Sequence, residues 1–160
     1  MSFGMIHFVG SYDCKVDAKG RVLLPTHFRK ELGEGESFCF VIKKHVYEQC
    51  LELYTKEAWD ERIELLNDII NPFIREDQQV EREFRMGSTM VETDPIGRIL
   101  IPARLLKQAE ISADALLTGY KGRIEIWQPD LYVKSSGDDK ERQERHERIF
   151  SRAKLKNREA

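Results

Sequence analysis

The feature that most constrains the fold of this chain is an internal repeat. Asp-Ala-Lys-Gly-Arg-Val-Leu-Leu-Pro at residues 17–25 recurs without a gap as Asp-Pro-Ile-Gly-Arg-Ile-Leu-Ile-Pro at residues 94–102, and the same spacing relates Gly10-Ser11 to Gly87-Ser88. A looser match relates Leu-Glu-Leu-Tyr at 51–54 to Ile-Glu-Ile-Trp at 124–127. Two copies are too few for a solenoid, which needs at least three. We therefore expect two half-domains that complete one shared core.

Each copy predicts the same series of elements. A strand leads into a tight turn, where the Asp can bond its own backbone and the Gly supplies the positive φ that the turn requires. An aliphatic strand follows and ends at Pro25 or Pro102, and proline suits the first turn of a helix. A hairpin completes each copy. The expected ranges are strands 8–16 and 88–93, turns 17–20 and 94–97, aliphatic strands 21–24 and 98–101, helices 26–32 and 103–109, and hairpins 37–43 with 49–54 and 115–120 with 123–128.

The segments that follow the two copies differ. The first copy is followed by an expected helix at 56–66 and by a second helix that opens at Asn71-Pro72 and runs to Arg85, with Phe73, Val80 and Phe84 on one stripe. The second copy is followed by a short helix at 129–133, a break at 135–138, and a mostly charged segment expected as a solvated helix or a frayed tail. The predicted division is 7–54 and 87–134 for the two halves, 55–86 for a helical insert or linker, and 135–160 for the tail.

The net charge of −2 excludes a uniformly basic protein that coats nucleic acid, but the charges are unevenly distributed. Residues 1–30 carry five basic and two acidic side chains, whereas residues 31–86 carry seven basic and fourteen acidic ones. Residues 87–134 carry six of each sign, and residues 135–160 carry eight basic and six acidic ones. A chain with this separation can present a basic surface despite its acidic total.

Cysteine usage and hydropathy predict a cytoplasmic protein. The three cysteines are odd in number and lack CxxC spacing, which is typical of free thiols in a reducing compartment. The first ten residues lack the basic and apolar regions of a signal peptide, and no apolar run approaches the ~20 residues of a membrane helix. We therefore expect no membrane partner.

Patterns that indicate a cofactor, a metal or catalysis are weak. The four histidines are dispersed, and Gly33-x-Gly35 lacks the third glycine of a dinucleotide loop. No nucleophile lies in a recognisable local signature. The carboxylates of residues 57–68 have the spacing of a solvated helix face. We therefore expect no enzyme activity, no cofactor, no metal site and no small-molecule substrate.

The repeated Asp-x-x-Gly-Arg turn is the strongest candidate for a functional site. Its structural interpretation is an Asp–Arg ion pair across the turn in both copies. A binding role is favoured at the first copy because its surroundings are basic, with Lys15, Lys19, Arg21, Arg29 and Lys30 within sixteen residues. The second copy has Glu92 and Ile96 in place of the first two lysines. If one face binds a polyanion, it is the first.

Double-stranded DNA fits this arrangement. A two-stranded ribbon or its turn can enter the major groove, where an arginine binds guanine O6 and N7 through two hydrogen bonds. We expect Arg21 to contact the base or the backbone, Lys19 and Lys15 to hold phosphates, and Asp17 and Gly20 to shape the loop. The counterparts Asp94, Gly97 and Arg98 either repeat the contact weakly or stabilise their own turn.

At the repeated Asp-x-x-Gly-Arg-(aliphatic)₃-Pro segment the chain closely resembles the MraZ family of bacterial transcription regulators, over roughly residues 7–135. The resemblance implies an α+β, mainly β fold, in which two pseudo-symmetric AbrB-like swapped-hairpin halves form a shared β-barrel with flanking helices. It also implies a closed homo-oligomeric ring, a nucleoid-associated location, and repression through short guanine-rich direct repeats upstream of the regulator's own division and cell-wall operon. The family's DNA-binding loop falls here on Asp17 and Arg21.

Two other interpretations remain open. The chain could be an AbrB-like oligomerisation module that binds no DNA, with the duplicated arginine serving subunit packing. It could also be an enzyme that uses the carboxylate-rich insert. DNA binding by an Arg21 variant and the oligomeric state of an Arg98 variant distinguish these interpretations from a DNA-binding repressor.

Overall fold

The computed structural model describes residues 4–33, 35 and 37–159. Ala160, the end of the predicted tail, lies outside the described residues. The chain divides into two compact units, Met1–Pro129 and Asp130–Ala160. No helix over the described residues combines the length and the apolar character needed to cross a bilayer.

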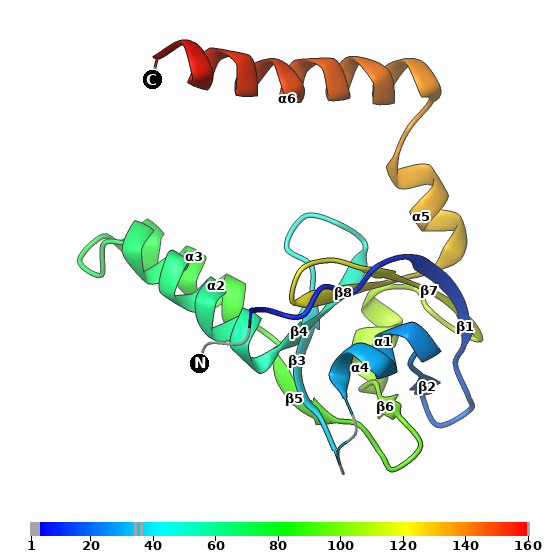
Figure 1. The fold of residues 1–160 in the computed structure, drawn as a ribbon. Coiled ribbons are helices and arrows are strands. Elements are labelled where there is room, and N and C mark those ends of the chain that lie inside the picture. Colours follow the sequence, from blue (N-terminus) through cyan, green and yellow to red (C-terminus); the bar gives the residue numbers. More distant parts are fainter. Residues whose placement is uncertain (1–3, 34, 36, 160) are drawn as a thin grey trace. The chain divides into compact units, whose positions relative to one another are not determined.

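The first unit contains an antiparallel six-stranded sheet (Figure 1). Its strand order is β1-β7-β8-β4-β3-β5. The strands are β1 (Ser11–Lys15), β3 (Cys39–Lys44), β4 (Cys50–Thr55), β5 (Thr89–Glu92), β7 (Asp114–Gly119) and β8 (Arg123–Trp127). Replacing each strand by its counterpart in the other copy of the repeat gives the same order in reverse, so each copy contributes one edge strand and one hairpin.

Two short strands, one from each copy, form a separate antiparallel pair that we call the ribbon: β2 (Arg21–Leu23) and β6 (Arg98–Leu100). The chain enters the ribbon from the two edge strands of the sheet, from β1 into β2 and from β5 into β6. Since β1 and β5 do not pair with each other, the hydrogen bonds of the described strands form an open sheet. They do not close the barrel that the resemblance implied.

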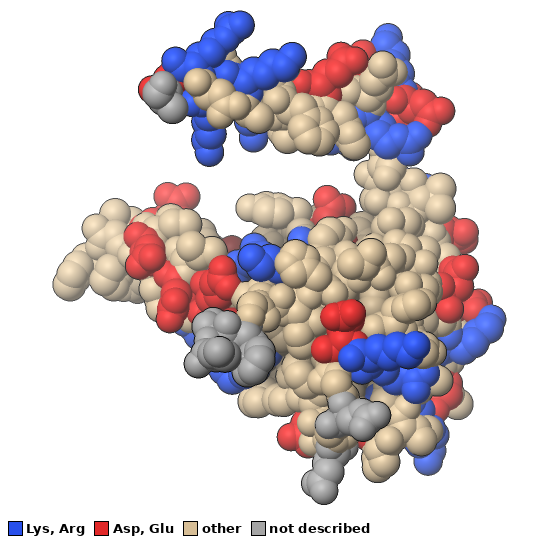
Figure 2. All heavy atoms as spheres, in the orientation of Figure 1, with Lys and Arg blue, Asp and Glu red and all other residues tan. Residues whose placement is uncertain are grey.

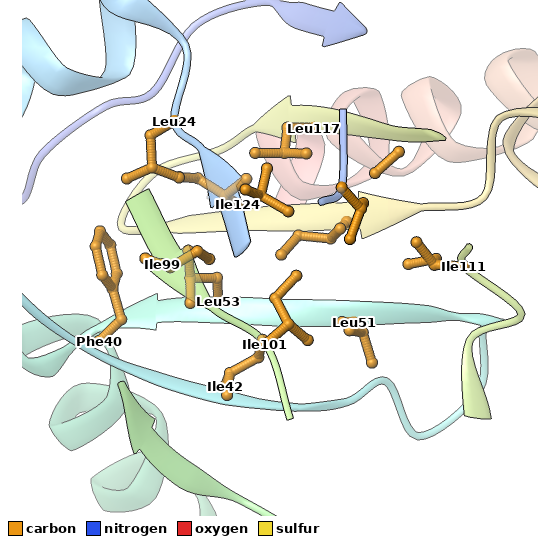
Figure 3. Close-up of a cluster of buried hydrophobic side chains, with 14 of the residues drawn as sticks. Leu24, Phe40, Ile42, Leu51, Leu53, Ile99, Ile101, Ile111, Leu117 and Ile124 are labelled. Atoms are coloured by element: carbon orange, nitrogen blue, oxygen red, sulfur yellow. The ribbon is translucent and has the colours of Figure 1, made fainter. Parts of the chain in front are cut away.

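The ribbon and the sheet share one hydrophobic core. The ribbon contributes Val22 and Ile99, both fully buried, and the sheet contributes side chains such as Ile42 and Leu53. Figure 3 shows the labelled side chains of ribbon and sheet gathered in this core. The helices α1 (Thr26–Leu32) and α4 (Ala103–Gln108) each follow the proline of their copy and bury one large residue in the same core, Phe28 and Leu105. Alternation along the strands therefore directs the ribbon's remaining side chains to solvent.

The helical insert packs against the other face of the sheet. It consists of α2 (Lys56–Ile69) and α3 (Arg75–Arg85), and Thr55 caps α2 by accepting a hydrogen bond from the Ala58 N–H at 3.1 Å. Trp59 of α2 stacks on Phe84 of α3 with ring centroids 5.7 Å apart, and both belong to a second apolar cluster with Val41 and Tyr54. The insert thus covers the side of the sheet opposite the main core.

Most of the expected elements are confirmed, with two corrections. The second insert helix begins at Arg75 and not at Asn71-Pro72, because residues 71–74 form a turn in which the Asn71 side chain accepts the Phe73 N–H at 3.0 Å. Phe73 is therefore outside the helix and 94% exposed, so it does not join the apolar stripe. The α+β class is confirmed, but the mainly-β weighting is wrong, because helices hold more of the described residues than strands do.

The second unit is helical. Its helices are α5 (Pro129–Ser135), which starts at the unit boundary, and α6 (Asp139–Glu159). No residue of α6 is buried. The helical interpretation of the charged tail is confirmed, and α6 is a solvated helix without a core of its own.

Candidate nucleic-acid interface

The outer face of the ribbon carries two arginines and two leucines. Arg21 of β2 lies opposite Leu100 of β6, and Leu23 lies opposite Arg98. The two leucines are about half exposed, at 45% and 54%, while the arginine side chains are 33% and 31% exposed. Val22 and Ile99, between them, point into the core. The pairing therefore places both repeated arginines on one solvent-facing surface, which the sequence did not predict.

In the first loop, Asp17–Arg21, one carboxylate organises the whole turn. Oδ1 of Asp17 accepts the backbone N–H groups of Lys19 and Arg21, each at 2.9 Å. Oδ2 accepts Nε of the Arg21 side chain at 2.7 Å. These bonds lower the pKa of Asp17 to about 2, the Arg21 backbone N–H being the largest contributor. The aspartate is therefore fully charged at neutral pH and fixes both the loop and the arginine.

The second loop, Asp94–Arg98, has the same geometry. Oδ1 of Asp94 accepts the N–H groups of Ile96 and Arg98 at 3.1 and 2.9 Å, and Oδ2 accepts Nε of Arg98 at 2.6 Å. Burial alone would raise the pKa of Asp94, but the hydrogen bonds from Arg98 and Ile96 outweigh it and lower that pKa. The structure thus confirms an Asp–Arg ion pair in both copies.

Each loop is also hydrogen-bonded to the residue that directly follows the ribbon strand of the other copy. The Leu24 N–H donates to the Gly97 carbonyl at 3.1 Å, and the Ile101 N–H donates to the Gly20 carbonyl at 2.9 Å. Both glycines have left-handed φ angles, +89° and +90°. The two loops are therefore parts of one hydrogen-bonded unit.

Each Asp–Arg pair uses only the Nε of its arginine. Over the described residues, the terminal Nη groups of Arg21 and Arg98 have no hydrogen-bond partner. Two parallel Nη–H donors are what a guanine edge or a phosphate accepts. The aspartate thus orients the guanidinium and leaves its binding end open.

The predicted lysines differ in their surroundings. Lys15, at the end of β1, forms an exposed ion pair with Asp114 of β7. Lys19, in the first loop, is exposed, and no side-chain ion pair or hydrogen bond joins its amine to the rest of the described chain. Arg29 of α1 lies at the second loop, where it lines a groove with Ile96 and Gly97. Its Nε donates to the Leu24 carbonyl at 2.9 Å.

The sheet also holds a buried charged row that the sequence analysis missed. Lys43, Glu52 and Glu125 lie opposite one another on β3, β4 and β8, and are 1%, 5% and 6% exposed. Nζ of Lys43 lies 3.7 Å from Oε1 of Glu52 and 4.4 Å from the Phe84 ring centre. It has no hydrogen bond to any residue that the structure describes, and burial lowers the pKa of Lys43. A detectable signal existed, since Glu52 and Glu125 hold matching places in the two copies.

This row does not have the chemistry of an open metal site. His45, Glu52 and Glu125 offer ligand atoms within 4.8 Å of one another. However, Glu125 already accepts Nη1 of Arg123 at 2.9 Å, together with the Tyr120 hydroxyl at 3.1 Å and the Trp127 indole at 3.0 Å. Arg123 supplies both glutamates with the positive charge that a metal ion would bring, at 3.7 Å from Glu52 and 2.9 Å from Glu125. The arrangement is a buried ion-pair network.

Comparisons with known proteins agree on one family. The family described as "MraZ protein, putative antitoxin-like" matches residues 7–79 and 84–153. The chain is 39% identical over 130 residues to a protein of Flavobacterium psychrophilum named transcriptional regulator MraZ, covering 81% of this chain and 82% of that protein. Relatives with the same name from Christiangramia forsetii and Bacteroides fragilis are 38% and 37% identical, covering 84% and 77% of this chain and 88% and 78% of their own lengths.

Proposed function

Because the chain belongs to the MraZ family, we propose that it is a sequence-specific DNA-binding transcriptional regulator that acts without catalysis. The finer proposal is a cytoplasmic, nucleoid-associated repressor. It binds short guanine-rich direct repeats upstream of its own division and cell-wall operon. The observation that carries the proposal is the outer face of the ribbon, where two oriented arginines present Nη groups that no other described residue binds.

The ribbon has the chemistry of a reader of double-stranded DNA. A two-stranded antiparallel ribbon fits the major groove, and an arginine held by a carboxylate has lost much of the freedom that binding would otherwise restrict. Arg21 binds a guanine edge or the backbone beside it, while Asp17 and Gly20 hold the loop in shape. Arg98 makes the same contact more weakly, with Asp94 and Gly97 in the shaping roles.

The lysines act on phosphates. The Lys19 amine extends from the first loop without a partner among the described residues, so it can bind a phosphate without breaking any contact that they make. Lys15 must exchange its exposed Asp114 pair for the phosphate, and exposed pairs are worth little. We therefore expect Lys19 to contribute more than Lys15.

We also propose that the two halves, 7–54 and 87–134, are pseudo-symmetric, that 55–86 is an insert and 135–160 an appended tail, and that the chain assembles into a homo-oligomeric ring. Two observations support the pseudo-symmetry. Exchanging the strands of the two copies reproduces the strand order in reverse, and the Gly20–Ile101 and Gly97–Leu24 hydrogen bonds are equivalent in the two copies. A ring would multiply weak contacts through effective concentration, which suits an operator made of several repeats.

A second candidate is an oligomerisation module that binds no DNA. It is favoured by one observation, that the Asp–Arg pair is kept in the second loop although Lys19 is replaced by Ile96. An Asp–Arg pair that only stabilises its own turn would be present whether or not a lysine lies beside it.

The test is binding of wild type, Arg21→Ala and Arg85→Ala to duplex DNA from upstream of the gene and to a scrambled duplex of equal composition. One bidentate base contact is worth about 1–3 kcal/mol, so Arg21→Ala is expected to lose roughly 5- to 150-fold in affinity for the upstream duplex and much of its preference. Arg85 is an exposed arginine at the end of α3, in the helical insert and outside the ribbon and both loops, and its variant should bind like wild type. Unchanged affinity and preference in Arg21→Ala would contradict the proposal.

A further inference from the structure

The two halves of α6 carry different charge patterns. Residues 139–147 contain four acidic and three basic side chains, whereas residues 148–158 contain no acidic and five basic ones. The five are Arg148, Arg152, Lys154, Lys156 and Arg158. All are exposed, and Figure 2 shows blue side chains gathered towards the C-terminal end of this helix. We call residues 148–158 the basic half-helix.

The cations of the basic half-helix lie in rows. Residues four apart share a helix face, so Arg148, Arg152 and Lys156 form one row about 12 Å long, and Lys154 and Arg158 form a second. Like charges at this spacing repel each other. Over the described residues, none of the five has an ion pair or a side-chain hydrogen bond, whereas Arg142 in the first half pairs with Asp139. The structure thus leaves a linear array of cations without an anion.

We propose that the basic half-helix binds the phosphate backbone of double-stranded DNA, independently of base sequence. The inference rests on the proposed function, since it adds a second contact to a chain whose ribbon reads the operator. A duplex offers one negative charge per about 1.7 Å of its axis, and binding releases condensed counterions. Neutralising the rows also removes the repulsion within the helix, so the contact favours the helix as well as the complex.

A competing anion is the α2–α3 insert of a second copy, because residues 56–85 carry nine acidic and five basic side chains. Several of its charges are already paired, as in Lys56–Asp60 and Arg85–Glu81. Its carboxylates are therefore interspersed with cations, unlike the continuous charge of a duplex. The charge pattern favours DNA over an acidic protein surface.

The experiment compares two triple variants of the full chain, each of which removes three cations from α6. R148Q/R152Q/K156Q removes one row of the basic half-helix, and K140Q/R142Q/R145Q removes the three cations that are interspersed with acids. Glutamine is a good helix former, so the substitutions change charge more than helicity. Fluorescence anisotropy at several KCl concentrations measures binding to the upstream duplex and to the scrambled duplex, and light scattering measures the mass of the assembly.

We expect R148Q/R152Q/K156Q to lower the affinity for both duplexes by a similar factor. We also expect it to reduce the slope of log K against log salt by up to about 2.7, at about 0.9 per phosphate contact. Preference for the upstream duplex should stay unchanged, and the control variant should change the slope by less than about 1. Equal slopes for wild type and R148Q/R152Q/K156Q would overturn the inference. Loss of assembly mass in that variant would also overturn it, in favour of an interface between copies.

The same measurements separate this inference from the proposed function. If wild type prefers the upstream duplex but the slope is unaffected by R148Q/R152Q/K156Q, the inference alone is wrong. If wild type binds both duplexes equally and the slope falls in that variant, the backbone contact is supported and sequence-specific regulation is contradicted. If wild type binds neither duplex, both are wrong.

Discussion

The first loop and the second loop have one geometry and two different environments. In both, an aspartate accepts two backbone N–H groups and the Nε of the arginine four residues later. The first loop exposes Lys19 where the second has Ile96. The apolar side chain of Leu106 lies beside Gly20 in the first loop, whereas the Arg29 side chain lies beside Gly97 in the second.

This comparison separates what shapes the loop from what gives it charge. Asp, Gly and Arg are common to both loops and suffice for the hydrogen-bond pattern, so the lysine is not needed for the fold. The second loop also regains part of its lost positive charge, because Arg29 comes from the first copy. The two loops therefore differ less in the positive charge around them than their own sequences indicate.

The largest expected effect is on the free energy of unfolding, and it differs between the two loop glycines. Gly20→Ala and Gly97→Ala should both destabilise, by about 1–2 kcal/mol, because alanine is strained at their φ angles of +89° and +90°. Gly20→Ala should cost about 1 kcal/mol more. Its Cβ would lie 2.9 Å from the carbonyl oxygen of Ile101, which is backbone. At Gly97 the obstacle is the Arg29 side chain, which can change rotamer by giving up its hydrogen bond to the Leu24 carbonyl. Urea unfolding followed by tryptophan fluorescence measures both.

A double variant provides the control for this prediction. Adding Arg29→Ala to Gly97→Ala removes the collision. What remains is the backbone strain, together with the loss of the Arg29 hydrogen bonds to the Leu24 carbonyl and the Thr26 hydroxyl. Equal losses for the two single glycine variants would show that the loops tolerate a side chain equally. The difference in their surroundings would then have no energetic consequence.

The next effect concerns DNA and compares Arg98→Ala with Arg21→Ala. Both arginines lie on the outer face of the ribbon, but the second loop lacks the lysine, so we expect Arg98→Ala to lose less than about tenfold in affinity. Anisotropy with the upstream duplex measures the loss. A loss equal to that of Arg21→Ala would mean that both loops read DNA alike. Loss of the oligomer with intact affinity per assembly would assign Arg98 to subunit packing.

The local elements of this fold could be predicted because the sequence pattern of each element occurs in both copies of the repeat. The helix at 26–32 agrees with α1 residue for residue, and the strands, the hairpins and the Asp–Arg turns lie within a few residues of their predicted places. Turn chemistry is local: an Asp, a Gly and an Arg at fixed spacing specify it. The turn hydrogen bonds of Asp17 and Asp94 are therefore accessible from the sequence.

The arrangement across the two copies was not accessible, because strand pairing between distant segments leaves no local signal. The pairing of β2 with β6 places Arg21 and Arg98 on one face. It depends on which strands of the two copies pair and in which register, and neither segment alone indicates this. The facing of Glu52 and Glu125 depends on the β4–β8 register in the same way. The Asn71-Pro72 pair suits a turn as well as the start of a helix, so the sequence alone does not locate the start of α3. The hydrogen bond from the Phe73 N–H to the Asn71 side chain stabilises the turn.

A smaller effect tests whether charge alone distinguishes the loops. Ile96→Lys gives the second loop the lysine of the first, and Lys19→Ile makes the opposite change. One added phosphate contact should steepen the salt dependence of DNA binding by about 0.9 and one lost contact should reduce it equally. Anisotropy over a range of KCl concentrations measures both slopes. If Ile96→Lys has no effect while Lys19→Ile weakens binding, the second loop does not face the phosphates.

The smallest effect is the pH dependence of the two aspartates. The folded pKa of Asp17 is about 2, below its ordinary value of 3.8, so the unfolded chain binds more protons between these values. The stabilisation by its carboxylate is therefore complete above about pH 4 and is lost as the pH falls through about 2. The pKa of Asp94 is also lowered, with the same sign.

Unfolding of wild type, Asp17→Asn and Asp94→Asn between pH 2 and pH 6 tests this expectation. Each variant should be less stable than wild type at pH 6 and should approach it as the pH falls, because asparagine cannot titrate. The convergence should have the same sign for both variants, since the pKa of each aspartate is lowered in the folded chain. Parallel curves for a variant and wild type would mean that its carboxylate charge does not hold the arginine. The matching geometry of the two loops would then depend on backbone conformation alone.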